Sequence, residues 1–277
     1  MAALIPISDA NPTRRFPIVT IALIAINVVV FFLVEPGFGM DAAATEYFYE
    51  NAPVPCQLES CPTGIEDVGT TDFLVASVFS TFLHAGFMHI IGNMLFLWVF
   101  GNNIEDHLGR VKYVGFYLLG GLAASLAHSL WTLRVDPMSI PEINACLQGA
   151  SDACSGIGQY VPSVGASGAV AAVMGAYIVL YPKAKVNVLV PIFILLTVVQ
   201  MSAIVVLGIW FLYQFLIGAP DIAGVGDHSG VAWMAHVGGF VFGAVGILLL
   251  GGRPHRHPPD ARFQVGREWP TDDRYDR

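Results

Sequence analysis

Residues 164–177 read VGASGAVAAVMGAY, a small-residue apolar helix with one serine, Ser167, near its start. Ser167, Ala171 and Gly175 follow one another at intervals of four, so they form a stripe on one helical face. Such stripes let membrane helices pack closely. A lone serine here is more often a packing residue, bonded to a carbonyl one turn back, than a nucleophile. The rest of the chain has to decide between these two interpretations.

The composition indicates a membrane protein. The chain has 277 residues, of which 55% are hydrophobic and 12% charged, and its mean hydropathy is +0.64. This is too apolar for a water-soluble domain of this size. The length accommodates about six spans, because each span needs about 20 residues. The net charge of −8 leaves no electrostatic footprint for nucleic acid, so we expect no nucleic-acid partner, whereas the apolar composition predicts contact with the lipid bilayer.

We predict an all-α membrane protein, a bundle of six transmembrane helices. The apolar runs fall at 17–34, 77–100, 112–133, 164–181, 186–217 and 231–250. The first run ends without a small-residue cleavage site, so we expect it to remain as the first span. The bundle then covers residues 17–251, between an N-terminal segment, 1–16, and a polar C-terminal tail, 252–277, that we expect to be disordered.

Charge predicts the orientation of this bundle. In a six-span arrangement, 12 of the 13 lysines and arginines lie on the same side of the membrane as the two termini, and only Arg134 lies on the opposite side. The positive-inside rule therefore puts the N and C termini in the cytoplasm. We expect a multi-pass protein of a prokaryotic plasma membrane, with its active site opening to the non-cytoplasmic side.

All cysteines lie in the segments predicted to face outward, at Cys56, Cys61, Cys146 and Cys154. In an oxidising compartment they predict two disulfides, for which three connectivities are possible. The local pairs Cys56–Cys61 and Cys146–Cys154 are favoured because both close short loops. Four free thiols are the alternative. Zinc is disfavoured, since neither spacing is a tight ligand pair and no histidine lies in these loops.

Two polar residues share one predicted depth in the membrane. Ser167 and His236 each precede the end of their apolar run by 14 residues (181 − 167 and 250 − 236), or about 21 Å of helix. His236, Gly239 and Gly243 form a stripe like that of Ser167. Packing the two small-residue faces together would bring the imidazole towards the hydroxyl.

This pairing predicts a Ser–His catalytic dyad. A serine is a weak nucleophile unless a base lies within hydrogen-bond reach, which His236 would provide for Ser167. The alternative for His236 is a packing histidine bonded to a neighbouring backbone. No Asp or Glu falls inside the second to sixth predicted helices. Asp221 and Asp227 precede the sixth helix and could orient the histidine only if their loop folded inward.

Donors for an oxyanion are also predicted. Ser167 begins its helix, where backbone N–H groups have no intrahelical acceptor. His89 and Asn93 lie four residues apart on one helical face, and both side chains can donate. Gly165 and Gly168 allow close approach of substrate or backbone. Alone, the His89 and Asn93 pair would suggest an interhelical hydrogen bond, but beside a dyad it favours an oxyanion hole.

Four motifs carry a resemblance to a known family. They are His84-x-x-x-x-His89-x-x-x-Asn93, Gly101-x-x-x-Glu105-x-x-x-Gly109, Gly165-Ala166-Ser167-Gly168 and Ala235-His236-x-x-Gly239-x-x-x-Gly243. Over residues 17–251 the chain resembles the rhomboid intramembrane serine proteases. The resemblance implies a six-helix bundle that needs no metal or cofactor and cuts other membrane proteins in or near a transmembrane segment, after a small side chain.

The same resemblance implies residue roles. Ser167 would be the nucleophile and His236 the general base, and the Ser167 N–H, His89 and Asn93 would form the oxyanion hole. The chain departs from the family in two places. Many relatives have an aromatic residue where this chain has Ala171, so the histidine must be held differently. Some bacterial relatives also carry a Trp-Arg pair in the first outer loop, which here contains no arginine.

Two other function classes compete with the protease. One is a catalytically inactive rhomboid-like protein that binds membrane proteins; such proteins typically lose the serine or the histidine, and both are present here. The other is a small membrane transporter. A transporter predicts inverted repeats, broken helices or intramembrane carboxylates, and the sequence displays none of these.

Overall fold

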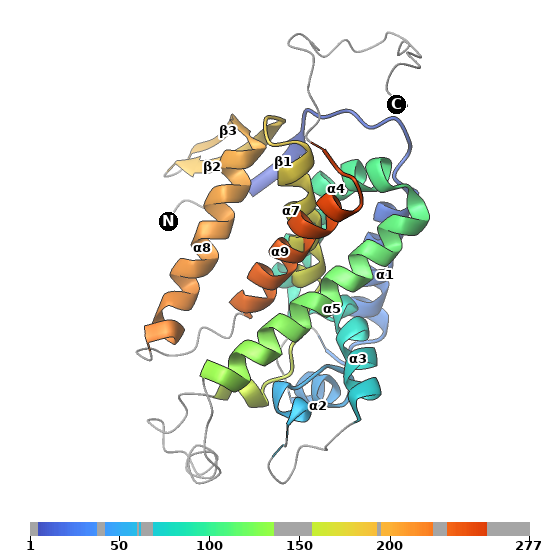
Figure 1. Ribbon diagram of the computed structural model, residues 1–277, viewed down its shortest axis with the longest axis vertical. Helices are drawn as coiled ribbons and strands as arrows, with labels where there is room; N and C mark the ends of the chain where they lie inside the picture. Colours follow the sequence, from blue (N-terminus) through green and yellow to red (C-terminus); the bar gives the residue numbers. More distant parts are fainter. Residues whose placement is uncertain are drawn as a thin grey trace.

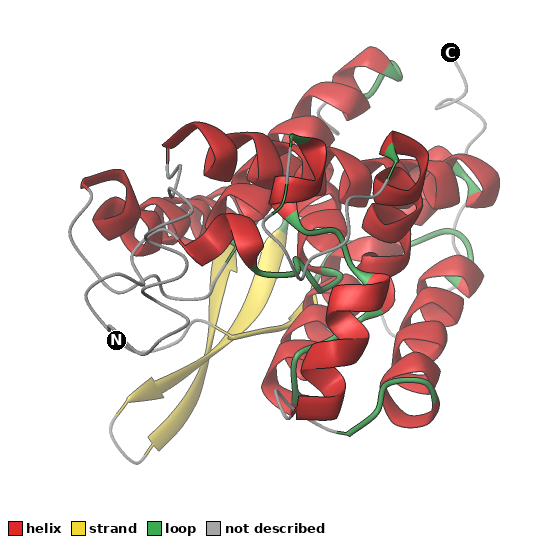
Figure 2. Cartoon of the chain, turned by 90° about the horizontal axis from the view of Figure 1, so that it is seen from below, coloured by secondary structure: helices red, strands yellow, loops and turns green. Residues whose placement is uncertain are grey.

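The computed structural model describes residues 5–37, 42–59, 61, 69–135, 157–192, 195–223 and 232–253. This part of the chain is mostly helical and carries one small sheet (Figures 1 and 2). The α-helices are α1 (Ile18–Leu33), α2 (Ala42–Asn51), α3 (Thr70–Phe79), α4 (Phe87–Leu108), α5 (Arg110–Val135), α7 (Ser167–Leu180), α8 (Ala203–Ala223) and α9 (Trp233–Leu249). Short 3₁₀ turns are η1 (Pro55–Leu58), η2 (Ser80–Phe82) and η4 (Ile157–Tyr160), and the strands are β1 (Ile5–Asp9), β2 (Lys185–Ile192) and β3 (Leu195–Ser202).

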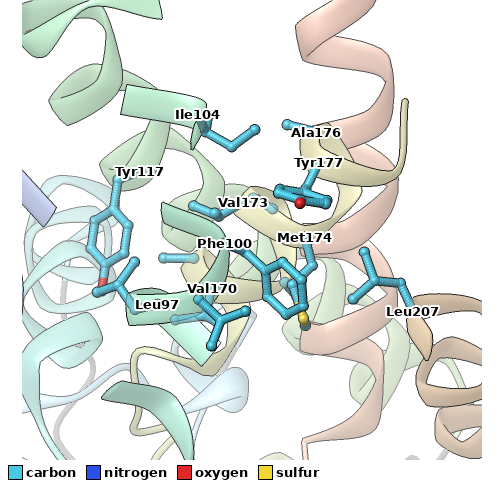
Figure 3. Packing of buried hydrophobic residues seen from close by; sticks show 14 of the residues in the cluster. Leu97, Phe100, Ile104, Tyr117, Val170, Val173, Met174, Ala176, Tyr177 and Leu207 are labelled. Carbon is cyan, nitrogen blue, oxygen red and sulfur yellow. The ribbon is translucent and has the colours of Figure 1, made fainter. Parts of the chain in front are cut away.

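The helix that contains Ser167 lies at the centre of the bundle. Every residue of α7 from Gly168 to Tyr177 is buried, and the helix contacts α4, α5, α8 and α9. Figure 3 shows α7 side chains interleaved with Phe100 of α4 and Leu207 of α8. The Phe100 and Tyr177 rings meet edge to face, with centroids 4.9 Å apart. Because lipid is as apolar as this core, close packing of the helices stabilises it more than the hydrophobic effect does.

The prediction of an all-α protein is wrong for residues 185–202. The apolar run 186–217 begins as the hairpin β2–β3, and β1 pairs antiparallel with β2 to complete a three-stranded sheet. Val186 and Val188 are buried while Lys185 is exposed, which is the alternation of a strand. β-branched residues favour this conformation, and Pro191 could not continue a helix. The sheet lies at one end of the bundle, hereafter the sheet end (Figure 1).

The predicted helix 77–100 is also wrong in its first turns. α3 ends at Phe79, η2 follows, and α4 begins only at Phe87. The N–H of His84 lies between them and donates to the Glu35 carboxylate, at 2.9 Å, instead of to a helical carbonyl. The Glu35 side chain, just beyond α1, therefore accepts from an N–H group that a continuous helix would have bonded to one of its own carbonyls.

α4 continues past its predicted end at residue 100 to Leu108, and a side chain in these polar last turns bonds the first N–H groups of α1. Glu105 is buried and accepts hydrogen bonds from the N–H groups of Val19 and Thr20, at 3.0 and 2.7 Å. It thereby caps a helix whose preceding residue is a proline without a capping side chain. Gly109 ends α4 with φ of 75°, which suits glycine. The Gly101…Glu105…Gly109 motif therefore has a structural role.

Two of the helices within the described ranges have the length and apolar character to cross a membrane, Phe87–Leu108 and Arg110–Arg134. Four shorter apolar helices accompany them, at Ile18–Leu33, Ser167–Leu180, Ala203–Leu216 and Trp233–Leu249. These correspond in order to the six predicted apolar runs.

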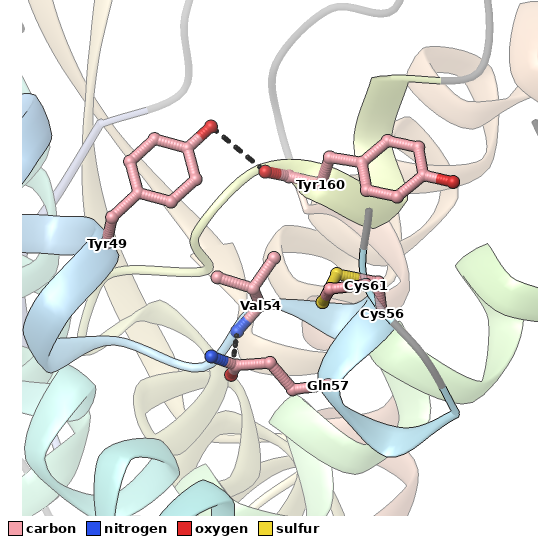
Figure 4. The surroundings of a disulfide bond; sticks show 6 residues. All are labelled: Tyr49, Val54, Cys56, Gln57, Cys61 and Tyr160. Carbon is pink, nitrogen blue, oxygen red and sulfur yellow. Dashed lines mark hydrogen bonds between the residues drawn. A yellow bond between two sulfur atoms is a disulfide. The ribbon is translucent and has the colours of Figure 1, made fainter. Parts of the chain in front are cut away.

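A disulfide joins Cys56 to Cys61, with Cα atoms 5.1 Å apart, so this predicted local pair is confirmed (Figure 4). η1, which contains Cys56, is at the opposite end of the bundle from the sheet, together with α2 and α3; this is hereafter the disulfide end (Figure 1). The Tyr49 hydroxyl donates to the Tyr160 carbonyl, at 3.0 Å, and ties α2 to η4. Cys146, Cys154 and the tail from residue 254 are outside the described residues.

Candidate active site

Ser167 is the first residue of α7, at the end of the helix that points towards the disulfide end. The first N–H groups of a helix have no intrahelical acceptor. In α7 the preceding residue, Ala166, has no side chain that could accept from them. The Gly165 N–H donates to the Ser80 carbonyl, at 3.0 Å, and this bond holds the approach to the helix. An anion beside Ser167 would thus meet free backbone donors and the positive end of a helix dipole.

Gly165 brings Ser167 and His89 to the same point in space. Its φ is 128°, and a Cβ built there would lie 2.7 Å from His89 Nε2 and 3.7 Å from Ser167 Oγ. Only glycine leaves room for the imidazole beside the serine. The Ala85 N–H lies 3.4 Å from His89 Nδ1, and a ring nitrogen that accepts carries no proton. In the neutral ring the proton is then on Nε2, the atom that faces Gly165.

Asn93 lies one turn further along α4. It is buried, and its Nδ2 has no hydrogen-bond partner among the described residues. A buried amide without a partner is costly, so its donor is expected to serve a bound group. His84 lies on the other side of His89, with ring centroids 5.2 Å apart, and is also buried.

α7 and α9 pack backbone to backbone along a contact that we call the α7–α9 seam. It consists of Gly168, Ala172 and Gly175 on α7 and Gly239, Phe240 and Gly243 on α9. A Cβ at Gly239 would collide with the Gly168 carbonyl, and one at Gly243 with the Ala172 carbonyl. Gly168, Gly239 and Gly243, which the sequence predicts to shape the site, thus lie where the two helix backbones come closest.

The seam sets the relative height of the proposed dyad. Both glycine contacts have the same offset (239 − 168 = 243 − 172 = 71), so the two helices run parallel. Ser167 precedes the first contact by one residue and His236 precedes it by three. Two residues of helix correspond to about 3 Å, so the two side chains start from nearly the same level.

His236 is held from α8. Its Nδ1 lies 2.7 Å from Gln214 Oε1, and its ring lies 5.7 Å from the Trp210 ring, centroid to centroid. Ala171, which replaces the aromatic residue of many relatives, is fully buried in the core. The sequence analysis missed Gln214 and Trp210 as site residues. Their spacing of four on a helix was the available signal, since it puts an amide and an aromatic on one face.

A small polar cavity adjoins Ser167. Its volume is about 20 Å³, enough for one water molecule, which needs about 10–15 Å³. The hydroxyl-bearing residues of its lining are Ser80, Thr81, Ser125, Ser163 and Ser167. Such a cavity can keep a water near the serine in an otherwise apolar bundle. Within the described ranges, no cluster of three His, Cys, Asp or Glu side chains could hold a metal ion.

The relation of the two acidic residues of the 218–230 segment to His236 lies outside what the structure describes. Asp227 is outside the described residues, and the side chain of Asp221, near the end of α8, is likewise not described. The described group that faces Nδ1 of the histidine is the Gln214 amide.

Comparison with known proteins supports the resemblance. The profile of the Rhomboid domain family matches residues 74–253. Similar proteins include Presenilin-associated rhomboid-like protein A, mitochondrial, of Danio rerio, which is 28% identical over 172 residues, covering 60% of this chain and 35% of that protein. Rhomboid protein 1, mitochondrial, of Saccharomyces cerevisiae is 32% identical over 112 residues, 40% of this chain and 27% of its own length. RHOMBOID-like protein 12, mitochondrial, of Arabidopsis thaliana is 28% identical over 179 residues, 64% of this chain and 46% of its own.

These matches span less than half of each relative's length. They also contradict the predicted location in a prokaryotic plasma membrane, because these relatives are eukaryotic proteins named as mitochondrial. The physical reason for the error is that hydropathy and charge asymmetry report on spans and sidedness. They contain no information about which membrane a protein occupies.

Proposed function

Because this chain belongs to the rhomboid family, we propose that it is an intramembrane serine endopeptidase that cleaves transmembrane segments of other membrane proteins. The observation that carries the proposal is the convergence at Gly165. There the Ser167 hydroxyl, the His89 Nε2 and the free start of α7 face one small region, with the unpaired Asn93 amide one turn away. Donors gathered around a hydroxyl suit acyl transfer.

The proposed chemistry uses the Ser167–His236 dyad. The Ser167 Oγ attacks the scissile carbonyl while His236 Nε2 takes its proton, and the same nitrogen then protonates the leaving amine. The oxyanion of the tetrahedral intermediate accepts hydrogen bonds from the Ser167 N–H, His89 Nε2–H and Asn93 Nδ2–H. A water activated by His236 then hydrolyses the acyl-enzyme and restores the serine. The cavity beside Ser167 is a source for that water.

We also propose six spans, formed by α1, α4, α5, α7, α8 and α9. Helices shorter than the hydrocarbon core can be accommodated when the bilayer thins around them. The site would open towards the disulfide end, from which α7 begins. Its substrates would be transmembrane helices with a small residue before the cleaved bond, because little space surrounds Ser167.

Labelling and cleavage together test this function. The purified protein in detergent should react with a fluorophosphonate and cut at least one member of a panel of transmembrane substrates, and Ser167→Ala should do neither. The matched control is Ser129→Ala, which removes a buried serine hydroxyl of α5 that has no partner among the described residues. A folded wild-type protein that neither labels nor cleaves would instead indicate the inactive, substrate-binding relative.

A further inference from the structure

Gln214 is a buried polar side chain that the proposed mechanism has not yet used. It lies on α8, and it is 3% exposed. Its Oε1 lies 2.7 Å from His236 Nδ1, although the two residues belong to different helices. Trp210, one turn earlier on α8, lies against the same imidazole. Two residues of one helical face thus fix the position of the histidine ring.

The hydrogen bonds of the amide determine which atom faces the histidine. Gln214 Nε2 lies 3.4 Å from the Trp210 carbonyl oxygen, which can only accept. The NH₂ group therefore points to that carbonyl, and the amide oxygen points to His236. An amide oxygen can only accept, so His236 must donate from Nδ1. In the neutral ring Nε2 is then unprotonated, and this is the form that a general base requires.

We infer that Gln214 is a positioning residue of the catalytic site, in the place that a carboxylate has in a Ser–His–Asp triad. It selects the histidine tautomer with a free Nε2 and stabilises the imidazolium formed during the reaction. This inference rests on the proposed function. A neutral amide does this at membrane depth without the large cost of burying a carboxylate. It also accounts for a histidine whose Nδ1 faces an amide oxygen, with no carboxylate bonded to it among the described residues.

The decisive variant is Gln214→Met, which keeps the length of the side chain and removes the acceptor. Loss of one hydrogen bond to a charged group predicts a fall in kcat of about 10- to 100-fold, with KM changed less than about twofold. The rate of fluorophosphonate labelling of Ser167 should fall in parallel. Gln214→Glu, whose carboxyl oxygen can accept from Nδ1 in the neutral as well as the ionised form, should recover most of both rates despite a lower stability. A purely structural role would alter stability without this recovery.

The control is Gln200→Met on β3, where the glutamine is exposed and remote from the histidine. It should leave kcat and the labelling rate unchanged. If Gln214→Met is poorly folded, the kcat of Gln214→Glu is compared with that of the wild type instead. A folded Glu variant with less than one hundredth of wild-type kcat overturns the inference. Full activity of folded Gln214→Met overturns it as well. If Ser167 of the wild-type protein is not labelled, the proposed function itself is wrong. Failure of this inference and failure of the proposed function are therefore distinguishable.

Discussion

α7, which carries Ser167, and α8, which contacts His236, differ in how they are held in the bundle. α7 is buried along ten consecutive residues, Gly168 to Tyr177, and meets α9 through glycines and carbonyls. α8 begins at the end of the hairpin and exposes Val205, Leu212 and Leu216 by 42%, 61% and 59%. Ser167 therefore lies beside backbone contacts that cannot adjust, whereas the His236 ring is positioned by side chains of a helix at the edge of the bundle.

This difference indicates a division of labour. Backbone-to-backbone packing fixes the height of Ser167 and His236, because a collision with a carbonyl cannot be relieved by another rotamer. Side chains from α8 then fix the orientation of the imidazole. Changes at the α7–α9 seam should act on folding, and changes on the α8 side should act on rate. The following predictions test this difference.

The largest effect should come from the dyad itself. Ser167→Ala and His236→Ala should each lower kcat on the order of 10⁶-fold, to background, and the double variant should be no worse, because the two residues act as a unit. Turnover of a transmembrane substrate by purified protein measures this. Appreciable cleavage by Ser167→Ala would mean that another nucleophile operates and that the proposed function is wrong.

Removing an oxyanion donor should have an intermediate effect. Asn93→Ala should lower kcat about 10²- to 10³-fold with little change in KM, because the lost hydrogen bond forms only as charge develops on the substrate oxygen. His89→Ala should behave similarly. Asn102→Ala is the matched control, since this asparagine lies on the same helix near the sheet end. An Asn93→Ala variant with wild-type kcat would exclude Asn93 from the oxyanion hole.

Glycine substitutions compare the two regions directly. Gly243→Ala puts a methyl group against the Ala172 carbonyl, and overpacking of this kind typically costs about 1–3 kcal/mol in the free energy of unfolding. Gly208→Ala on α8 meets nothing within 4 Å and should be neutral or stabilising by up to about 1 kcal/mol. Unfolding in a denaturing detergent measures both. Equal effects at the two positions would contradict the contrast drawn between α7 and α8.

The smallest predicted effect concerns pH and Glu35, which is just beyond α1. Burial raises the pKa of its carboxyl from 4.5 to about 7. Glu35 thus binds its proton more tightly in the folded protein than in the unfolded chain. The stability that its protonated form contributes at acidic pH is therefore lost as pH rises through about 7. Glu35→Gln still accepts from the His84 N–H but cannot ionise.

We expect the melting temperature of Glu35→Gln to exceed that of the wild type by a few degrees at pH 8, and by less at pH 5. Thermal unfolding in detergent at both values measures the difference. Glu46→Gln on α2 is the control, because that carboxylate is exposed to solvent. The same difference at both pH values would show that Glu35 does not titrate in this range.

Sequence reasoning recovered the helices with long, uninterrupted apolar patterns. Residues 17–34, 112–133, 164–181 and 231–250 all contain a helix close to the predicted bounds, and the Cys56–Cys61 bridge followed from a short loop. It failed for residues 186–202, the first part of the predicted helix 186–217, which form the hairpin β2–β3. In a hydrophobic chain, a continuous apolar run is interpreted as a membrane span. The β-branched residues Val186 and Val188, two positions apart, favoured a strand instead. The small helices near the disulfide end were missed for lack of any strong pattern.

The sequence by itself determined that a serine and a histidine lie at nearly one depth on two small-residue faces, because helical rise and spacing are local properties. Only the tertiary structure decided what lies beside them. Gly165 places His89 next to the serine, and Gln214 faces the histidine across 2.7 Å, through contacts between segments far apart in the chain. Such contacts depend on how whole helices pack, and no local pattern of residue spacing encodes that packing.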